Sequence, residues 1–127
     1  GFATKQMEGI ADMDVFVRDI HHRMKADSPS GTALTTARVI LDHSTRKKQI
    51  LTDEKQPPQL DQLQISSARG GYIFGEHEVT FDSPQDTLQI IHTAKSRMGF
   101  AKGSLAAARW VSGKTGFFTI DDYLNDM

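Results

Sequence analysis

The stretch from residue 13 to residue 43 constrains the fold most, because it predicts a strand, a polar loop and a helix in succession. Met13–Ile20 is β-rich, and its alternation places Val15, Val17, Asp19 and His21 on one face. A helix is predicted over Thr32–His43, with an apolar stripe formed by Ala33, Leu34, Ala37, Ile40 and Leu41. Ser30 and Gly31 are the candidates for its amino-terminal cap.

The loop between these elements concentrates polar chemistry in the segment His21-His22-Arg23-Met24-Lys25-Ala26-Asp27-Ser28-Pro29-Ser30-Gly31-Thr32-Ala33. The first backbone N–H groups of a helix have no partner inside it and carry the positive end of its dipole, so Ser30-Gly31-Thr32 can bind an anion. The hydroxyls of Ser30 and Thr32 add donors, and Gly31 has no Cβ to hold a ligand away. His21 and Lys25 supply proton donors and a cation. The segment therefore predicts a site for an anionic substrate.

The histidine pair leaves alternatives open. Asp19 shares a strand face with His21, so its carboxylate either orients that imidazole or ends the strand by bonding to the loop backbone. His21 and His22 are either functional or two exposed loop histidines, and the adjacent Lys25 and anion-binding turn favour function. A zinc site is not favoured, because adjacent strand residues point to opposite faces and no second ligand follows at zinc-site spacing.

Three other positions carry candidate polar groups. His77 and His92 lie on apolar strand faces, and we expect both to be hydrogen-bonded core residues. Arg97 stands at a strand-to-helix junction, where it either binds a carboxylate or remains a surface cation. The Gly-Lys-Thr-Gly segment around Lys114 lacks the spacing of a phosphate-binding loop.

The rest of the chain predicts an α+β fold. Residues 44–59 form a polar surface excursion, and three strands are expected near 61–69, 72–82 and 86–95. A helix over Met98–Val111 and a final half-helix from Asp121 complete a mostly antiparallel or mixed four-stranded sheet with helices on one face. The other face is predicted to be an oligomer interface, because seven apolar residues exceed the need of one face: Ile65, Ile73, Val79, Phe81, Leu88, Ile90 and Ile91.

Composition narrows the class of protein. Fifteen basic and sixteen acidic residues give a formal charge of −1, so no basic excess favours nucleic acid as a partner. The absence of cysteine excludes a disulfide scaffold and thiolate zinc sites, and it is compatible with a reducing compartment. No apolar run reaches the length of a membrane span. We expect one cytoplasmic domain with no membrane partner.

Several motifs of the chain resemble dihydrodipicolinate reductase (4-hydroxy-tetrahydrodipicolinate reductase), a family of the bacterial lysine and diaminopimelate pathway. The resemblance runs from about residue 13 to the end, and its most specific part is His21-His22-x-x-Lys25-x-Asp27-x-Pro29-Ser30-Gly31-Thr32-Ala33. It continues through Arg69-Gly70-Gly71, Gly75-Glu76-His77-Glu78-Val79-x-Phe81, Ile91-His92-x-Ala94, Arg97-x-x-Phe100-Ala101-x-Gly103, Ala106-Ala107-x-x-Trp110 and Gly116-Phe117-Phe118-Thr119-Ile120-Asp121-Asp122.

The resemblance implies that residues 1–127 are a C-terminal domain that binds a cyclic dicarboxylate and forms a homotetramer. In the family an N-terminal Rossmann domain binds NADH or NADPH, and this sequence contains no G-x-G-x-x-G fingerprint. We therefore expect the chain to be inactive without a nucleotide-binding domain. Two departures are visible: the family usually has Glu where Asp19 stands, and the helix before the first strand is shortened at Gly1.

The same resemblance implies roles for the loop residues. His21 would be the general acid, and Lys25 would assist it or bind a carboxylate. The two carboxylates would be held by His22, Ser30, Gly31, Thr32 and Arg97, with no metal. The alternatives are a non-catalytic dicarboxylate-binding or assembly domain and a dicarboxylate-sensing regulatory module.

Overall fold

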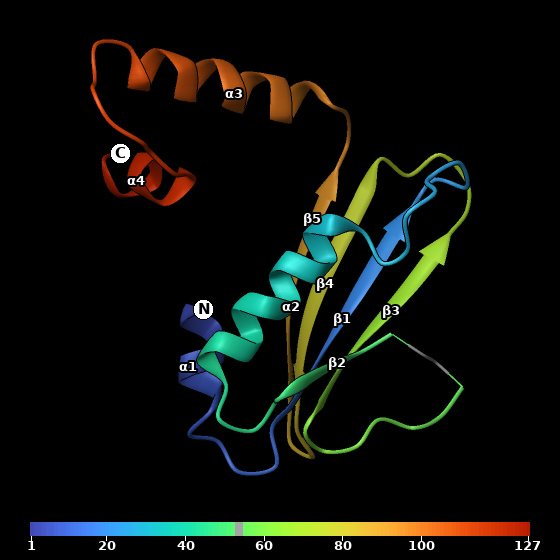
Figure 1. The fold of residues 1–127 in the computed structure, drawn as a ribbon. Helices are drawn as coiled ribbons and strands as arrows, with labels where there is room; N and C mark the ends of the chain where they lie inside the picture. The colour runs from blue at the N-terminus through green and yellow to red at the C-terminus, as the bar shows by residue number, and fades with distance from the viewer. Residues whose placement is uncertain (53–54) are drawn as a thin grey trace. The chain divides into compact units, whose positions relative to one another are not determined.

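The computed structural model describes residues 1–52 and 55–127, which form two compact units, Gly1–Lys95 and Ser96–Met127. Each unit is described by itself. The first unit contains α1 (Phe2–Met7), β1 (Asp14–His21), α2 (Gly31–His43), β2 (Gln49–Leu51), β3 (Gln62–Arg69), β4 (Gly75–Asp82) and β5 (Thr87–Ala94), as Figure 1 shows. The second unit contains α3 (Met98–Val111) and α4 (Ile120–Asn125).

The first unit is built on one mixed sheet with the strand order β2-β3-β1-β4-β5. The central strand β1 runs parallel to β3 and antiparallel to β4, and β4 and β5 form an antiparallel pair. The α+β class and the mixed sheet are confirmed, but the sheet has five strands where four were predicted. The additional strand, β2, lies inside the expected surface excursion, and its three residues are too few to show an alternating pattern.

The core lies between the sheet and α2, which crosses one face beside α1 (Figure 1). The predicted helix and its cap are confirmed: Ser30 is the amino-terminal cap, and its Oγ accepts the Ala33 N–H at 3.2 Å. The predicted stripe of α2 also packs inward. The buried apolar residues are Met13, Val15, Val17, Ala33, Ala37, Ile40, Leu63, Ile65 and Phe81.

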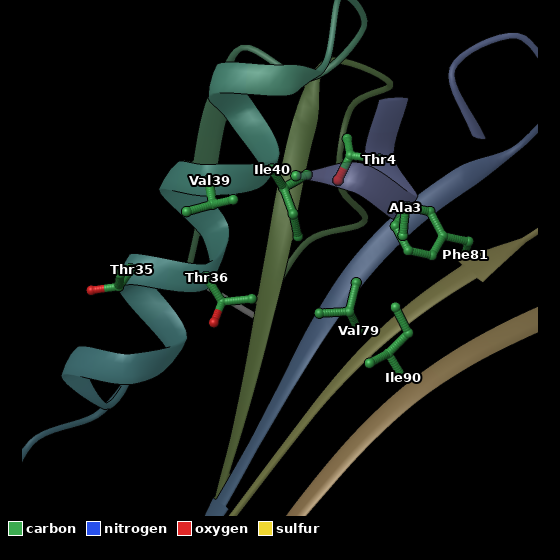
Figure 2. A pocket seen from close by; sticks show the side chains of 10 residues that line it. Ala3, Thr4, Thr35, Thr36, Val39, Ile40, Val79, Phe81 and Ile90 are labelled. Atoms are coloured by element: carbon green, nitrogen blue, oxygen red, sulfur yellow. The ribbon is translucent and has the colours of Figure 1, made fainter. Parts of the chain in front are cut away.

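The second face of the sheet is more polar than the sequence predicted, and the oligomer interface expected there stays a prediction. Val17 pairs with Val79, which pairs with Ile90, and Figure 2 shows Val79 and Ile90 on the side of α2. The opposite face carries Glu78, bonded to Arg18 at 3.0 Å and to Gln89 at 2.7 Å, together with the exposed Ile91 that pairs with it. The apolar excess belongs to β5, where Leu88 and Ile90 stay exposed on the side of α2 because that helix covers β1 and β3.

Beside these strands a groove of 210 Å³ lies between α1, α2 and the sheet (Figure 2). Its lining is mostly apolar and includes Ala3, Val39, Val79 and Ile90. The groove contains none of the polar residues that the sequence singles out.

The second unit is a helix pair stabilised by one aromatic cluster. The ring of Trp110 packs edge-on against Phe118 and Tyr123, each with centroids 5.4 Å apart. Its indole N–H donates to Asp126 at 2.6 Å, and Lys114 lies 3.8 Å from the ring centroid. The helix over Met98–Val111 is confirmed, and the final half-helix is α4. Among the described residues, no helix has the length and apolar character needed to cross a membrane.

Candidate functional site

A cluster of buried polar side chains lies at the carboxyl end of β1. The parallel strands β1 and β3 end at the same edge of the sheet, and the antiparallel β4 begins there. The strand alternation then places Asp19 and His21 on the face that α2 covers, together with Arg69 from β3 and His77 from β4. The amino end of α2 completes the cluster through Ser30.

Asp19 is the centre of this cluster and is completely buried. Its Oδ2 accepts hydrogen bonds from the Ser30 backbone N–H at 2.7 Å, from Arg69 at 2.9 Å and from Ser67 at 3.2 Å. Burial raises the pKa of Asp19, but the hydrogen bonds from Ser30 and Arg69 outweigh it and lower the pKa below its ordinary value. The carboxylate therefore stays charged in the interior. Both functions weighed for Asp19 are present, since it bonds the loop backbone and faces His21.

His21 lies against the other oxygen of Asp19. Its Nδ1 is 2.7 Å from Asp19 Oδ1, the distance of an ion pair when the imidazole is protonated. Neither atom has a hydrogen-bond partner among the residues that the structure describes. Burial lowers the pKa of His21, and the positive charges of Lys25 and Arg69 lower it further against the opposing charge of Asp19. The resting imidazole is therefore neutral at pH 7, and its protonated form is a stronger acid than a free histidine.

His77 was expected to be a core histidine, and it belongs to this cluster. Its Nε2 lies 3.1 Å from Ser30 Oγ and 3.7 Å from Asp19 Oδ1, and its ring meets His21 edge-on at 5.1 Å. Burial lowers the pKa of His77, with smaller contributions from the neighbouring His21, His92 and Lys25. The prediction for His92 was wrong: it is exposed, because it lies on the edge strand β5.

Ligand atoms of Asp19, His21 and His77 all lie within 4.8 Å of one another, which is close enough to share a metal ion. However, Arg69 already occupies one oxygen of Asp19, and Lys25 adds a second positive charge near His21. Two cations beside the ligand atoms disfavour a divalent ion electrostatically. The arrangement is better suited to holding a proton next to an anion.

The carboxylate of Asp27 occupies the turn that was predicted to bind an anion. Asp27 accepts from Lys25 Nζ at 2.7 Å, and this bond, together with the Gly31 backbone N–H, lowers the pKa of Asp27. Gly31 and Thr32 are exposed. The hydroxyl of Ser30 is buried and is used by the helix cap and by His77. Part of the predicted turn therefore stabilises the fold in this conformation.

The remaining predicted site residues lie in different environments. His22 is half-buried beside the cluster, and its backbone N–H donates to Ile73 at 2.7 Å. Arg97 belongs to the second unit, where it is the residue at the amino-terminal cap position of α3 and makes no side-chain cap bond. Arg69 and His77 were not predicted as site residues, although both stand in motifs that carry the family resemblance; strand pairing brings them to Asp19 and Ser30 from some fifty residues away.

The fold and the cluster define an α+β domain with an acid–base site at one edge of a mixed sheet. The family model for the C-terminus of dihydrodipicolinate reductase matches residues 2–124. The chain therefore belongs to the family of dihydrodipicolinate reductase C-terminal domains.

Relatives support this assignment over most of the chain. The 4-hydroxy-tetrahydrodipicolinate reductase of Christiangramia forsetii is 43% identical over 121 residues, which cover 95% of this chain and 49% of that protein. The enzyme of the same name from Methanosarcina mazei is 39% identical over 116 residues, covering 91% of this chain and 44% of that protein. The chain thus spans about half the length of these relatives.

A solved structure confirms the fold. The dipicolinate-bound dihydrodipicolinate reductase from Paenisporosarcina sp. TG-14 has a TM-score of 0.61 and 23% sequence identity to this chain. The match covers 82% of this chain and 41% of that one.

Proposed function

We propose that this chain is the substrate-binding and proton-donating part of a 4-hydroxy-tetrahydrodipicolinate reductase of lysine and diaminopimelate biosynthesis. The observation that carries the proposal is the buried contact of 2.7 Å between Asp19 and His21, next to the amino end of α2 and Lys25. This arrangement places His21, a candidate proton donor, beside two groups that can bind an anion, the amino end of α2 and Lys25. The family of the chain and the names of its relatives support the choice of substrate.

The residues of this chain do not fit a nicotinamide nucleotide. A dinucleotide-binding site needs a glycine-rich turn between a strand and a helix, and the turn between β1 and α2 carries histidine, lysine and proline instead. We therefore assign NADH or NADPH to a nucleotide-binding domain outside residues 1–127, and we derive only what this chain does.

Reduction of 4-hydroxy-tetrahydrodipicolinate to tetrahydrodipicolinate takes up one hydride and one proton and releases the 4-hydroxyl group as water, and this chain can supply the proton. Protonated His21 presents Nδ1–H to Asp19 and Nε2–H to the space beside Gly75, from which it would donate. Lys25, released from Asp27, would bind one substrate carboxylate. His22, Gly31, Thr32 and Arg97 would hold the carboxylates, while Ser30 would fix the amino end of α2.

Assembly and location complete the proposal. A homotetramer would use the polar face of the sheet around Glu78, Arg18 and Gln89, whose paired groups would make a more polar interface than the sequence predicted. A cytoplasmic location agrees with the absence of cysteine. The second candidate is a non-catalytic dicarboxylate-binding or assembly domain, which is favoured by the lack of a glycine-rich turn between β1 and α2.

Two measurements distinguish these functions. The chain joined to a nucleotide-binding domain should oxidise NADH or NADPH in the presence of 4-hydroxy-tetrahydrodipicolinate, whereas the chain alone should not. Calorimetry on the chain should show binding of pyridine-2,6-dicarboxylate that weakens as salt rises, because screening weakens charge pairing. Binding without turnover in the joined protein would favour the non-catalytic candidate, and absence of both would contradict the proposal.

A further inference from the structure

The Nε2 atom of the His21 ring lies against a position without a side chain. A Cβ built on Gly75, the first residue of β4, would lie 2.9 Å from His21 Nε2 and 3.2 Å from Cδ2. Real Cβ atoms essentially never approach other heavy atoms this closely. His21 cannot simply move aside, because Asp19 lies 2.7 Å from its Nδ1. The absence of a side chain at position 75 therefore keeps Nε2 accessible.

His77, two residues after Gly75 on β4, also contacts the His21 ring. The Oγ of Ser30 accepts the Ala33 N–H and lies 3.1 Å from His77 Nε2, so the two side chains share a hydrogen bond whose direction is set by the tautomer of His77. His77 thus joins the cap of α2 to the edge-on contact with His21, at a centroid distance of 5.1 Å and an interplanar angle of 71°.

We propose that His77 and Gly75 are positioning residues for His21: His77 shields the ring and ties it to the amino end of α2, and Gly75 leaves open the path to Nε2. The inference rests on the proposed function, in which His21 donates a proton. It adds two residues of β4 to a site whose expected members all lie outside that strand. Neither residue needs to contact substrate for this role.

The two residues should shift the ionisation of His21 in opposite directions. The charged and titratable groups around the ring are Asp19 from β1, Lys25 from the loop, Arg69 from β3 and His77 from β4. In Gly75→Ala the added methyl group buries Nε2 further, so the pKa of His21 should fall. In His77→Gln a smaller side chain admits water to the ring, so the pKa should rise towards its ordinary value. A purely structural role would not produce opposite shifts.

Nuclear magnetic resonance of the histidine rings in the 127-residue chain measures these shifts directly. Gly70→Ala is the control for the first variant, since a Cβ at Gly70 meets nothing within 4 Å. His43→Gln is the control for the second, because His43 lies at the far end of α2 and bonds only its own helix at Val39. Equal shifts in variant and control, shifts of the same sign, or no shift of the His21 pKa would overturn the proposal.

Kinetics of the chain joined to its nucleotide-binding domain test the consequence. Both variants should lower kcat by about 10- to 100-fold, the effect of a misplaced catalytic group, while KM for the dicarboxylate changes by less than about threefold. Unchanged kcat in both variants would refute the positioning role. If the joined wild-type protein reduced no substrate, the proposed function would fail, and the ring measurements would still decide whether His77 and Gly75 position His21.

Discussion

Buried charge is handled differently at the two ends of β1. At the amino end, Lys47 is 5% exposed and donates to Leu60 O at 3.0 Å, to Gln62 O at 2.8 Å and to Asp14 at 2.6 Å. At the carboxyl end, Asp19 Oδ1 and His21 Nδ1 are buried without a hydrogen bond among the described residues. Complete pairing indicates a structural role, whereas buried groups left incompletely paired are characteristic of functional sites.

Cavity size alone would have selected the wrong end. A cavity of 520 Å³ lies at the amino end, lined by charged groups that include Glu8, Asp14 and Lys47. Glu8 accepts from Ser44 and Thr45, and Lys47 donates to two backbone carbonyls, so both of these charged groups of the cavity already have partners. The comparison of the two ends teaches that buried polar groups without hydrogen-bond partners indicate the candidate site better than the volume of a cavity does.

The largest expected effect is a loss of kcat on substitution of His21, at the carboxyl end of β1. In the chain joined to a nucleotide-binding domain, His21→Gln should lower kcat by about 10²–10⁴-fold, the usual contribution of general acid catalysis, with little change in KM. His22→Gln should instead weaken dicarboxylate binding more than turnover. Steady-state kinetics checks both variants. Near-normal kcat in His21→Gln would leave Lys25 or water as the proton source.

The second prediction concerns the stability of the amino end. Lys47→Met should lower the free energy of unfolding by roughly 2–4 kcal/mol, because two backbone carbonyls lose their donor. The neighbouring exposed Lys48→Met is the matched control and should change it by less than about 0.5 kcal/mol. Urea unfolding followed by circular dichroism is the measurement, since Trp110 lies in the other unit. If folded Lys47→Met lost dicarboxylate binding, the assignment of a purely structural role to the amino end of β1 would be contradicted.

A third prediction uses the pH dependence of Glu8. Burial opposes its ionisation, but hydrogen bonds from Ser44 and Thr45 and the charge of Arg46 lower its pKa from 4.5 to about 2. A lowered folded-state pKa contributes stability above pH 4.5, and this contribution disappears as pH falls from about 4.5 to 2. Glu8→Gln should therefore cost about 1–3 kcal/mol at pH 7 and almost nothing near pH 2. A pH-independent difference in unfolding free energy would show that Glu8 acts through packing alone.

The smallest expected effect sharpens the description of the carboxyl end. Asp27 neutralises Lys25 at 2.7 Å and competes with a substrate carboxylate for the amino end of α2. Asp27→Asn should therefore strengthen binding of pyridine-2,6-dicarboxylate by about two- to fivefold, as expected for an exposed pair. Calorimetry at several salt concentrations measures the gain. Weaker binding in the variant would mean that Asp27 positions Lys25 instead of competing for it.

Local sequence patterns predicted most elements but not the way they pair. The cap at Ser30, the stripe of α2 and the proximity of Asp19 and His21 follow from spacing within a few residues. The short strand β2 and the partners of Asp19 depend on pairing across long stretches of sequence, which no local pattern contains.

The polar second face escaped prediction for a different reason. Counting apolar residues could not show that Val79 and Ile90 share a face. Their side chains alternate within their own strands, but the register between strands decides which faces meet. Leu88 and Ile90 of β5 therefore lie on the side of α2, and Ile91 alone of the exposed apolar residues of β5 lies on the second face.

The contacts that build the histidine cluster have a consequence for folding. Ser30 meets His77 47 residues away, and Arg69 reaches Asp19 over a separation of 50 residues. Such contacts form only after large loops have closed, and topologies rich in them fold slowly compared with helical bundles. Recovery of dicarboxylate binding during refolding should therefore lag behind the appearance of helix. A ligand present from the start should stabilise the completed sheet and not the separate segments, because only the completed sheet contains the cluster.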